Sequence, residues 1–110
     1  MRLHYRKSGT GRPLLILHGL LGSSDNWFSL AKVFAGLFEV YLVDQRNHGL
    51  SPQSAAFNYT LLVDDLHEFI QEHNLHEPII IGHSMGGKTA MNFAVRYPKM
   101  LSQLIVVDIV

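Results

Sequence analysis

The sequence contains no cysteine, which excludes a disulfide framework, a thiolate nucleophile and a cysteine metal site. It has no excess of charge either, because nine basic side chains balance nine acidic ones when the histidines are neutral. Nucleic acids and anionic membrane surfaces select basic proteins, so neither is expected as a partner. No apolar run is long enough to span a bilayer, and residues 1–7 lack the apolar core of a signal peptide. These absences predict a soluble, cytoplasmic protein.

The residues that are present are those of a folded domain. Hydrophobic residues make up 47% of the chain and charged residues 16%, which is too apolar for disorder. A length of 110 residues suits one small domain. There is no internal repeat, low-complexity segment or linker, so residues 1–110 are expected to belong to one domain.

Short apolar runs alternate with amphipathic stretches along the chain. The runs are too short for helices and predict strands that are buried on both faces, at residues 14–17, 40–43, 78–82 and 104–107. A weak alternation predicts a further strand at residues 2–7. Apolar positions at helical spacing predict helices from Trp27 to Leu37, Tyr59 to Ile70 and Gly87 to Tyr97. This order predicts an α/β fold, with a mostly parallel sheet and helices on both faces.

Polar residues indicate where two of these helices begin and which side faces solvent. Ser23 or Ser24 is a candidate N-cap for the first helix, and Asn58 for the second. In the second helix, Asp64 and Asp65 are expected opposite the apolar stripe, with His67 and Glu68.

The stretch Gly82-His83-Ser84-Met85-Gly86 lies between a predicted strand and a predicted helix. A G-x-S-x-G sequence at such a junction is typical of a nucleophile elbow, where a sharp turn presents the serine hydroxyl at its apex. The small glycines allow the strand and the helix to approach closely. The pattern is short, but its position favours Ser84 as a nucleophile over an incidental glycine-rich turn.

Chemically useful groups follow each of the predicted parallel strands. Since ligands bind at the carboxyl ends of such strands, these groups are expected at one edge of the sheet: His18-Gly19-Leu20, Asp44 with the loop from Arg46 to Gly49, Ser84, and Asp108. A serine nucleophile needs a base, a carboxylate that orients the base, and N–H donors for the oxyanion. The expected donors are the backbone N–H groups of Met85 and Leu20.

Three segments together resemble the α/β-hydrolase superfamily: residues 18–22, 44–52 and 82–88. The Arg-Asn-His-Gly-x-Ser-Pro loop with Gly-His-Ser-Met-Gly-Gly-Lys is most similar to a small esterase branch that includes the YbfF-type and abhydrolase-domain-11-type enzymes. The resemblance implies hydrolysis of a small-molecule carboxylic ester or thioester through an acyl-enzyme on Ser84, without a metal or organic cofactor. It also implies that Asp108 is the triad acid; otherwise Asp108 is a carboxylate that caps nearby backbone.

The resemblance also implies parts that have no match in this sequence. Members run to about 250 residues, and their catalytic histidine follows a final strand. The sequence therefore looks like the N-terminal part of a single α/β-hydrolase domain, truncated after the strand that follows the elbow helix, and weak or no turnover is expected from it alone. His48 is the only credible stand-in base, because His83 is expected to pack and His18 to hold the oxyanion loop.

The remaining candidates have simpler expected roles. Asp44 and Arg46 are expected to pair with each other and brace their loop, and Lys88 to be a surface lysine. Trp27 is expected in the core or in a pocket wall. Two other functions stay open: a C–C bond hydrolase or lyase that uses the same elbow, and a non-catalytic module that pairs through an exposed final strand.

Overall fold

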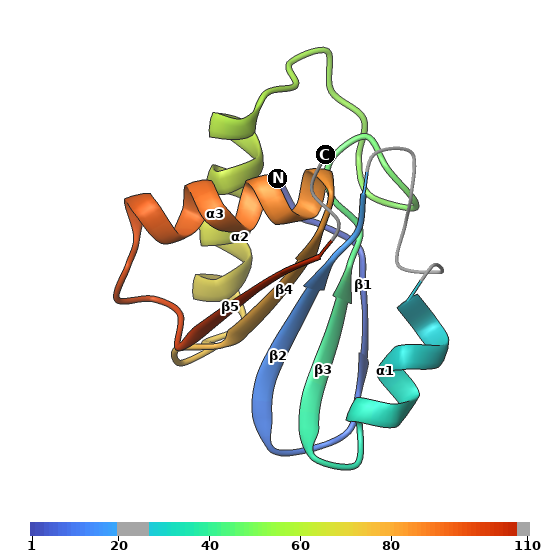
Figure 1. Cartoon of the computed structure of the whole chain (residues 1–110). Helices are drawn as coiled ribbons and strands as arrows, with labels where there is room; N and C mark the ends of the chain where they lie inside the picture. The colour runs from blue at the N-terminus through green and yellow to red at the C-terminus, as the bar shows by residue number, and fades with distance from the viewer. Residues whose placement is uncertain (20–26, 108–110) are drawn as a thin grey trace.

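The structure, a computed structural model, describes residues 1–19 and 27–107. Five strands form one sheet in the order β1-β3-β2-β4-β5 (Figure 1). Strand β1 (Tyr5–Ser8) runs antiparallel to β3, and the other neighbours pair in parallel. The parallel strands are β2 (Arg12–Leu17), β3 (Phe38–Val43), β4 (Ile79–His83) and β5 (Gln103–Val107). The predicted, mostly parallel sheet is therefore confirmed.

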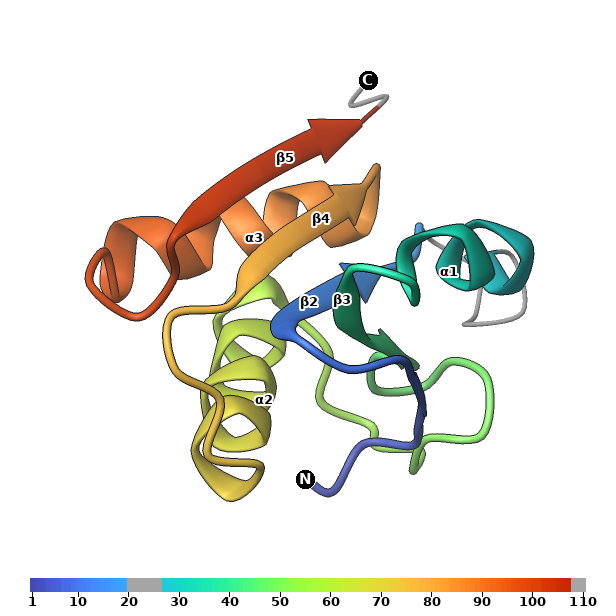
Figure 2. The ribbon, with the colours of Figure 1, turned by 90° about the horizontal axis from the view of Figure 1, so that it is seen from below.

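Helices cover both faces of this sheet, as predicted (Figure 2). Helix α1 (Phe28–Phe34) packs on the face that carries Leu14, Ile16 and Leu42. Helices α2 (Tyr59–Glu72) and α3 (Met85–Arg96) pack on the face that carries Leu15, Leu17 and Val43. Consecutive residues of β2 thus enter opposite cores, as the alternation of side chains along a strand requires. Within the described residues, no helix is both long enough and apolar enough to cross a bilayer.

The register of the parallel strands brings their carboxyl ends to one edge of the sheet. Leu17, the last residue of β2, pairs with Val43 on one side and with Gly82 on the other. His83, the last residue of β4, pairs with Val107. The segments that follow these strands therefore begin side by side, as the sequence predicts for a ligand site.

Helix α2 has the predicted cap but not the predicted polar face. The side-chain oxygen of Asn58 accepts the Leu61 N–H at 2.8 Å, which confirms Asn58 as the N-cap. Asp64 faces solvent as expected. The prediction for Asp65 is wrong, since it is only 3% exposed. A buried carboxylate requires a charged partner, which the loop after β3 supplies.

Helix α1 ends earlier than its apolar spacing predicts. It stops at Phe34, and Leu37 lies in the following turn with 77% of its surface exposed. The chain has to reverse there, because Phe38 already pairs with Arg12 at the start of β3. The candidate caps Ser23 and Ser24 lie outside the described residues.

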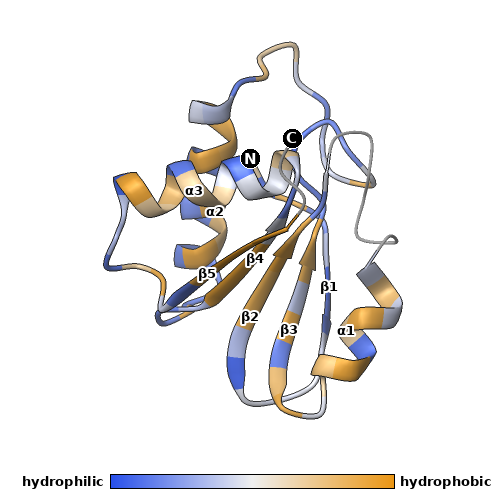
Figure 3. Cartoon of the chain, viewed as in Figure 1, coloured by the Kyte–Doolittle hydropathy of each residue, from blue (hydrophilic) through white to orange (hydrophobic). Residues whose placement is uncertain are grey.

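Strand β5 is the other departure from the predicted core. Its apolar run, visible in Figure 3, was expected to be buried on both faces, but Ile105, Val106 and Val107 are 45%, 37% and 36% exposed. Within residues 1–19 and 27–107, β5 pairs only with β4. Its other edge is therefore open in this part of the chain, and the exposed residues Ile105 and Val106 point to opposite faces of the strand.

Candidate active site

Ser84 occupies a sharp turn between β4 and α3. Its backbone has φ 52° and ψ −112°, a region that side-chain-bearing residues rarely adopt. The Ser84 N–H donates to the Val107 carbonyl at 3.1 Å, and the Ser84 carbonyl accepts the Lys88 N–H at 3.0 Å. The helix begins at Met85, two residues earlier than predicted, so the serine is its N-cap residue. The predicted strand–turn–helix geometry is confirmed.

The glycines of the turn are required by close backbone contacts. A Cβ on Gly82 would lie 2.4 Å from the Gly86 carbonyl oxygen. A Cβ on Gly86 would lie 2.3 Å from the carbonyl oxygen of Leu17 in β2. Any side chain at either position would push α3 away from the sheet and displace Ser84.

His18 links the end of β2 to the end of β3. Its Nε2 accepts the Gln45 N–H at 2.9 Å, so Nδ1 carries the proton and donates to the Gly19 carbonyl at 2.8 Å. The Gln45 side chain donates back to the His18 carbonyl at 3.0 Å and accepts from Thr89 of α3 at 3.0 Å. Both ring nitrogens of His18 are thus committed, which suits a positioning role and not that of a base.

Burial lowers the pKa of His18 from its usual 6.5, because desolvation disfavours the imidazolium form. The unfolded chain therefore takes up this proton at a higher pH than the folded chain. The contribution of His18 to stability is fully present above the unfolded pKa and is lost as the pH falls through the folded pKa. We expect urea unfolding to show a lower free energy at about pH 5.5 than at about pH 7.5.

The His18→Gln variant tests the origin of this pH dependence. Glutamine keeps one donor and one acceptor but does not titrate, so its unfolding free energy should change less across the same pH window. His76→Gln is the control, because the His76 side chain is 91% exposed and its surface pair with Glu77 contributes little to stability, so this variant should change the pH dependence far less than His18→Gln does. If the unfolding free energy of His18→Gln changes with pH as much as that of the unchanged protein, the assignment to His18 is contradicted.

Asp44 holds the start of the loop after β3. It is buried; its Oδ2 accepts from His4 Nδ1 at 2.8 Å and from the Leu50 N–H at 3.1 Å. Gly49 packs against this carboxyl with φ 53°, and a Cβ there would lie 2.4 Å from it. These contacts make Asp44 a support for the loop.

The expected pair between Asp44 and Arg46 is wrong. Arg46 Nε and Nη2 donate to the two carboxylate oxygens of Asp65 in α2, at 2.8 and 2.9 Å. Arg46 Nη1 donates to the Ala56 carbonyl at 2.9 Å. The bond to Asp65 raises the pKa of Arg46. Arg46 thus braces the loop as expected, but by tying it to α2.

The histidines near Ser84 have other contacts. His48 is buried, and its Nδ1 donates to the Arg46 carbonyl at 2.9 Å. The His83 ring packs edge-on against Trp27 with centroids 5.5 Å apart, in line with the packing role expected for it. Among the residues that the structure describes, no histidine hydrogen-bonds to Ser84.

Ser84 lines a cavity of about 360 Å³ between the start of α2 and the start of α3. The wall combines apolar and polar side chains from both elements: Phe57, Asn58, Tyr59, Leu62, Ser84, Met85 and Lys88. Lys88 is half-buried there, which differs from the surface lysine predicted. The cavity is large enough for a small organic molecule beside the serine hydroxyl.

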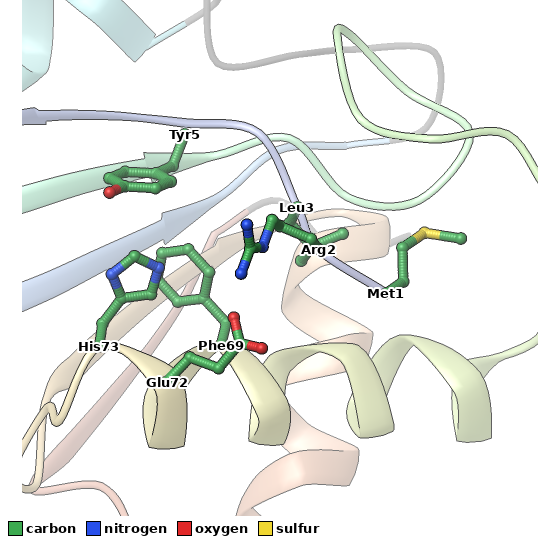
Figure 4. Close-up of a pocket in the computed structure, with 7 residues that line it drawn as sticks. All are labelled: Met1, Arg2, Leu3, Tyr5, Phe69, Glu72 and His73. Carbon is green, nitrogen blue, oxygen red and sulfur yellow. The ribbon is translucent and has the colours of Figure 1, made fainter.

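A second cavity of about 410 Å³ lies between the N-terminal segment and α2 (Figure 4). Its lining includes Arg2, Tyr5, Glu72 and His73, but none of the groups that follow the parallel strands. Burial lowers the pKa of His73. Because Ser84 and the other strand-end groups are not among the described residues that line it, this cavity is the weaker candidate for a reaction.

Some predicted site residues are not placed, and some supporting ones were not predicted. Leu20 and Asp108 lie outside the described residues. Gln45, Asp65 and Thr89 support the site but were not predicted to do so. For Gln45, the only indication in the sequence was its position next to Asp44. In residues 1–19 and 27–107, no cluster of three potential metal-ligating side chains occurs.

Known proteins resemble this chain in sequence and fold. A family model for the alpha/beta hydrolase fold matches residues 12–109. An abhydrolase domain-containing protein of Schizosaccharomyces pombe is 48% identical over 98 residues, which cover 87% of this chain and 36% of that protein. The sn-1-specific diacylglycerol lipase ABHD11 of Danio rerio is 41% identical over 103 residues, or 92% of this chain and 32% of the lipase.

A solved structure is equally similar. A marine microorganism esterase superposes with a TM-score of 0.93 and 54% sequence identity, over 94% of this chain and 40% of the esterase. The chain therefore spans about a third of the length of these curated relatives. The similarity extends across the three strand-end segments in which the sequence motifs lie.

Proposed function

The chain belongs to the α/β-hydrolase family, and on this premise we propose that it carries the nucleophile of a serine hydrolase acting on carboxylic esters or thioesters. One observation carries the proposal: Ser84 sits in a left-handed turn at the start of α3 and lines a cavity. A strained turn that holds a hydroxyl at a cavity wall is the geometry an exposed nucleophile needs.

The proposed reaction passes through an acyl-enzyme. Ser84 Oγ attacks the carbonyl carbon while a base takes its proton, and the carbonyl oxygen becomes an oxyanion. The first N–H groups of α3, beginning with Met85, have no partner within the helix and can donate to this oxyanion. The tetrahedral intermediate then expels the alcohol or thiol, which takes up a proton. Water hydrolyses the acyl-enzyme and restores Ser84.

The other proposed parts are a second oxyanion donor, Leu20, and the triad acid, Asp108. The contacts of His18 and Gln45 support the first of these, because they fix the backbone at Gly19, directly before Leu20. The base is proposed to come from outside these 110 residues. The hydrogen bonds of His18 and His48 support this, so we expect slow or no turnover from the 110-residue chain alone.

A fluorophosphonate probe followed by peptide mapping tests the function. In the whole protein the probe should label Ser84, and p-nitrophenyl butyrate should be hydrolysed. The 110-residue chain alone should hydrolyse it far more slowly. A folded protein that is not labelled would favour the non-catalytic module instead. Labelling of Ser84 without hydrolysis of any ester or thioester would favour a C–C bond hydrolase or lyase.

A further inference from the structure

Among the described residues that line the Ser84 cavity, Lys88 is the only charged one. It lies one helical turn after Ser84, and its N–H donates to the Ser84 carbonyl at 3.0 Å. The two residues therefore share the same side of α3, as residues four apart on a helix do. Its half-buried side chain brings a positive charge to the cavity that holds the serine.

Within residues 1–19 and 27–107, the Lys88 ammonium has neither a hydrogen bond nor an ion-pair partner, while most carboxylates of this part are already paired. Asp65 is bound by Arg46, and Asp64 pairs with Arg96 at 3.0 Å. Other pairs join Glu68 and Asp65 to the N-terminal ammonium, Asp44 to His4, Glu39 to Lys7, and Glu77 to His76. Lys88 thus brings its cavity a charge that no described side chain neutralises.

The other polar groups of the cavity are also able to donate hydrogen bonds. Asn58 uses its side-chain oxygen to cap α2 at the Leu61 N–H, which leaves its NH₂ as a donor. The hydroxyls of Tyr59 and Ser84 can donate as well. The first turn of α3 holds no acidic residue, so the positive end of the helix dipole adds to the same field.

Apolar side chains lie beside these donors. Phe57, Leu62 and Met85 complete the wall; Leu62 and Met85 are only 2% and 5% exposed, whereas Phe57 is 40% exposed. Such walls lower the local dielectric constant and strengthen an interaction with a charged ligand. A cation, several donors and an apolar surround match a ligand that is negatively charged at one end.

We propose that this cavity binds an anionic group of the substrate, a carboxylate or a phosphate, with Lys88 as its counter-ion. The preferred esters or thioesters then carry a negative charge close to the bond that Ser84 attacks. The charge belongs either to the acyl group, as in a half-ester of a dicarboxylic acid, or to the leaving alcohol or thiol. The identity of the reacting bond rests on the function proposed above, whereas anion binding does not.

Equilibrium binding tests the anion site without any turnover. Succinamate and butyramide have the same chain length, but only the first has a carboxylate. In the whole protein, NMR titration should show succinamate shifting the amide signals of Ser84 and Lys88, with about tenfold tighter binding than butyramide. Lys88→Met should remove this preference, and Lys88→Arg should keep it. Equal binding of the two ligands, or a preference that survives Lys88→Met, would overturn the proposal.

Two pairs of esters show where the substrate carries its charge. p-Nitrophenyl hemisuccinate and p-nitrophenyl butyrate differ in the acyl group, and the butyrate esters of 4-hydroxybenzoate and 4-hydroxybenzamide differ in the leaving group. Lys88→Met should lower the ratio of kcat/KM for the charged member to kcat/KM for the neutral member by about tenfold in one of the two pairs.

The ester kinetics and the succinamate titration together separate this proposal from the proposed function. If p-nitrophenyl butyrate is hydrolysed and Lys88→Met leaves the ratio of kcat/KM for charged to neutral ester unchanged in both pairs, the anion site is wrong and the hydrolase stands. If no ester is hydrolysed but succinamate still binds through Lys88, the hydrolase is wrong and the anion site stands.

Discussion

Ser84→Ala should lower hydrolysis of p-nitrophenyl butyrate by the whole protein by roughly 10⁴-fold or more, and should abolish fluorophosphonate labelling. The variant removes only the oxygen proposed to form the acyl-enzyme. It should spare the fold, since the Ser84 side chain makes no capping hydrogen bond and its backbone contacts remain. Turnover and the midpoint of thermal unfolding, measured on the same sample, separate loss of chemistry from loss of structure.

Ser102→Ala is the matched control for this experiment. The Ser102 hydroxyl is buried and, within the described residues, has no hydrogen-bond partner. It lies just before β5, where its N–H donates to the Pro78 carbonyl, at the end of the sheet opposite Ser84. Its removal should leave turnover unchanged. Near-normal activity in Ser84→Ala, or an equal loss in both variants, would contradict the assignment of Ser84 as the nucleophile.

The second large effect is expected on stability. Asp65→Ala should lower the free energy of unfolding by about 3–5 kcal/mol, because it leaves the Arg46 guanidinium buried without its counter-ion. The two side chains are only 9% and 4% exposed, and the pair is bidentate. Urea unfolding measures the change. The same variant should loosen the loop that Arg46 ties to α2, and with it Phe57 in the cavity wall.

The neighbouring residue provides the control. Asp64 also pairs with an arginine, Arg96, but both side chains are more than 40% exposed. Asp64→Ala should therefore lower the free energy of unfolding far less than Asp65→Ala does. Replacing both partners of the buried pair, as Arg46→Met with Asp65→Leu, should restore most of the lost stability. If Asp64→Ala and Asp65→Ala lower the free energy of unfolding by similar amounts, burial does not determine the strength of these ion pairs.

The parts of the fold that the sequence predicts are those that local pattern determines. The runs at Leu14–Leu17 and Val40–Val43 are buried on both faces, so their unbroken apolar character identified them as central strands. The elbow was predictable because Gly82 and Gly86 are required within a few residues of Ser84. The resemblance to the abhydrolase-domain-11 branch is confirmed by the sn-1-specific diacylglycerol lipase ABHD11 of Danio rerio among the relatives.

The errors concern contacts between residues that are distant in the sequence. The periodicity of α2 placed Asp65 on the solvent side, and only its position opposite Arg46 explains its burial. Proximity in sequence suggested Asp44 as the partner of Arg46, although the two support different parts of the loop. The apolar run of β5 predicted a buried strand, since an apolar strand has the same pattern whether or not a neighbour covers it. An exposed final strand was expected only for the alternative of a non-catalytic module.

The position of β2 in the sheet also determines the order in which the chain can fold. Strand β2 pairs with β3 on one side, but Leu14 meets Ile79 of β4 on the other, a contact that spans most of the chain. Pairings of such high contact order form slowly. During synthesis, one edge of the apolar strand β2 therefore stays open until β4 has left the ribosome, and this edge can associate with other nascent chains. Ser84 is synthesised immediately after β4, the strand that pairs with this open edge of β2.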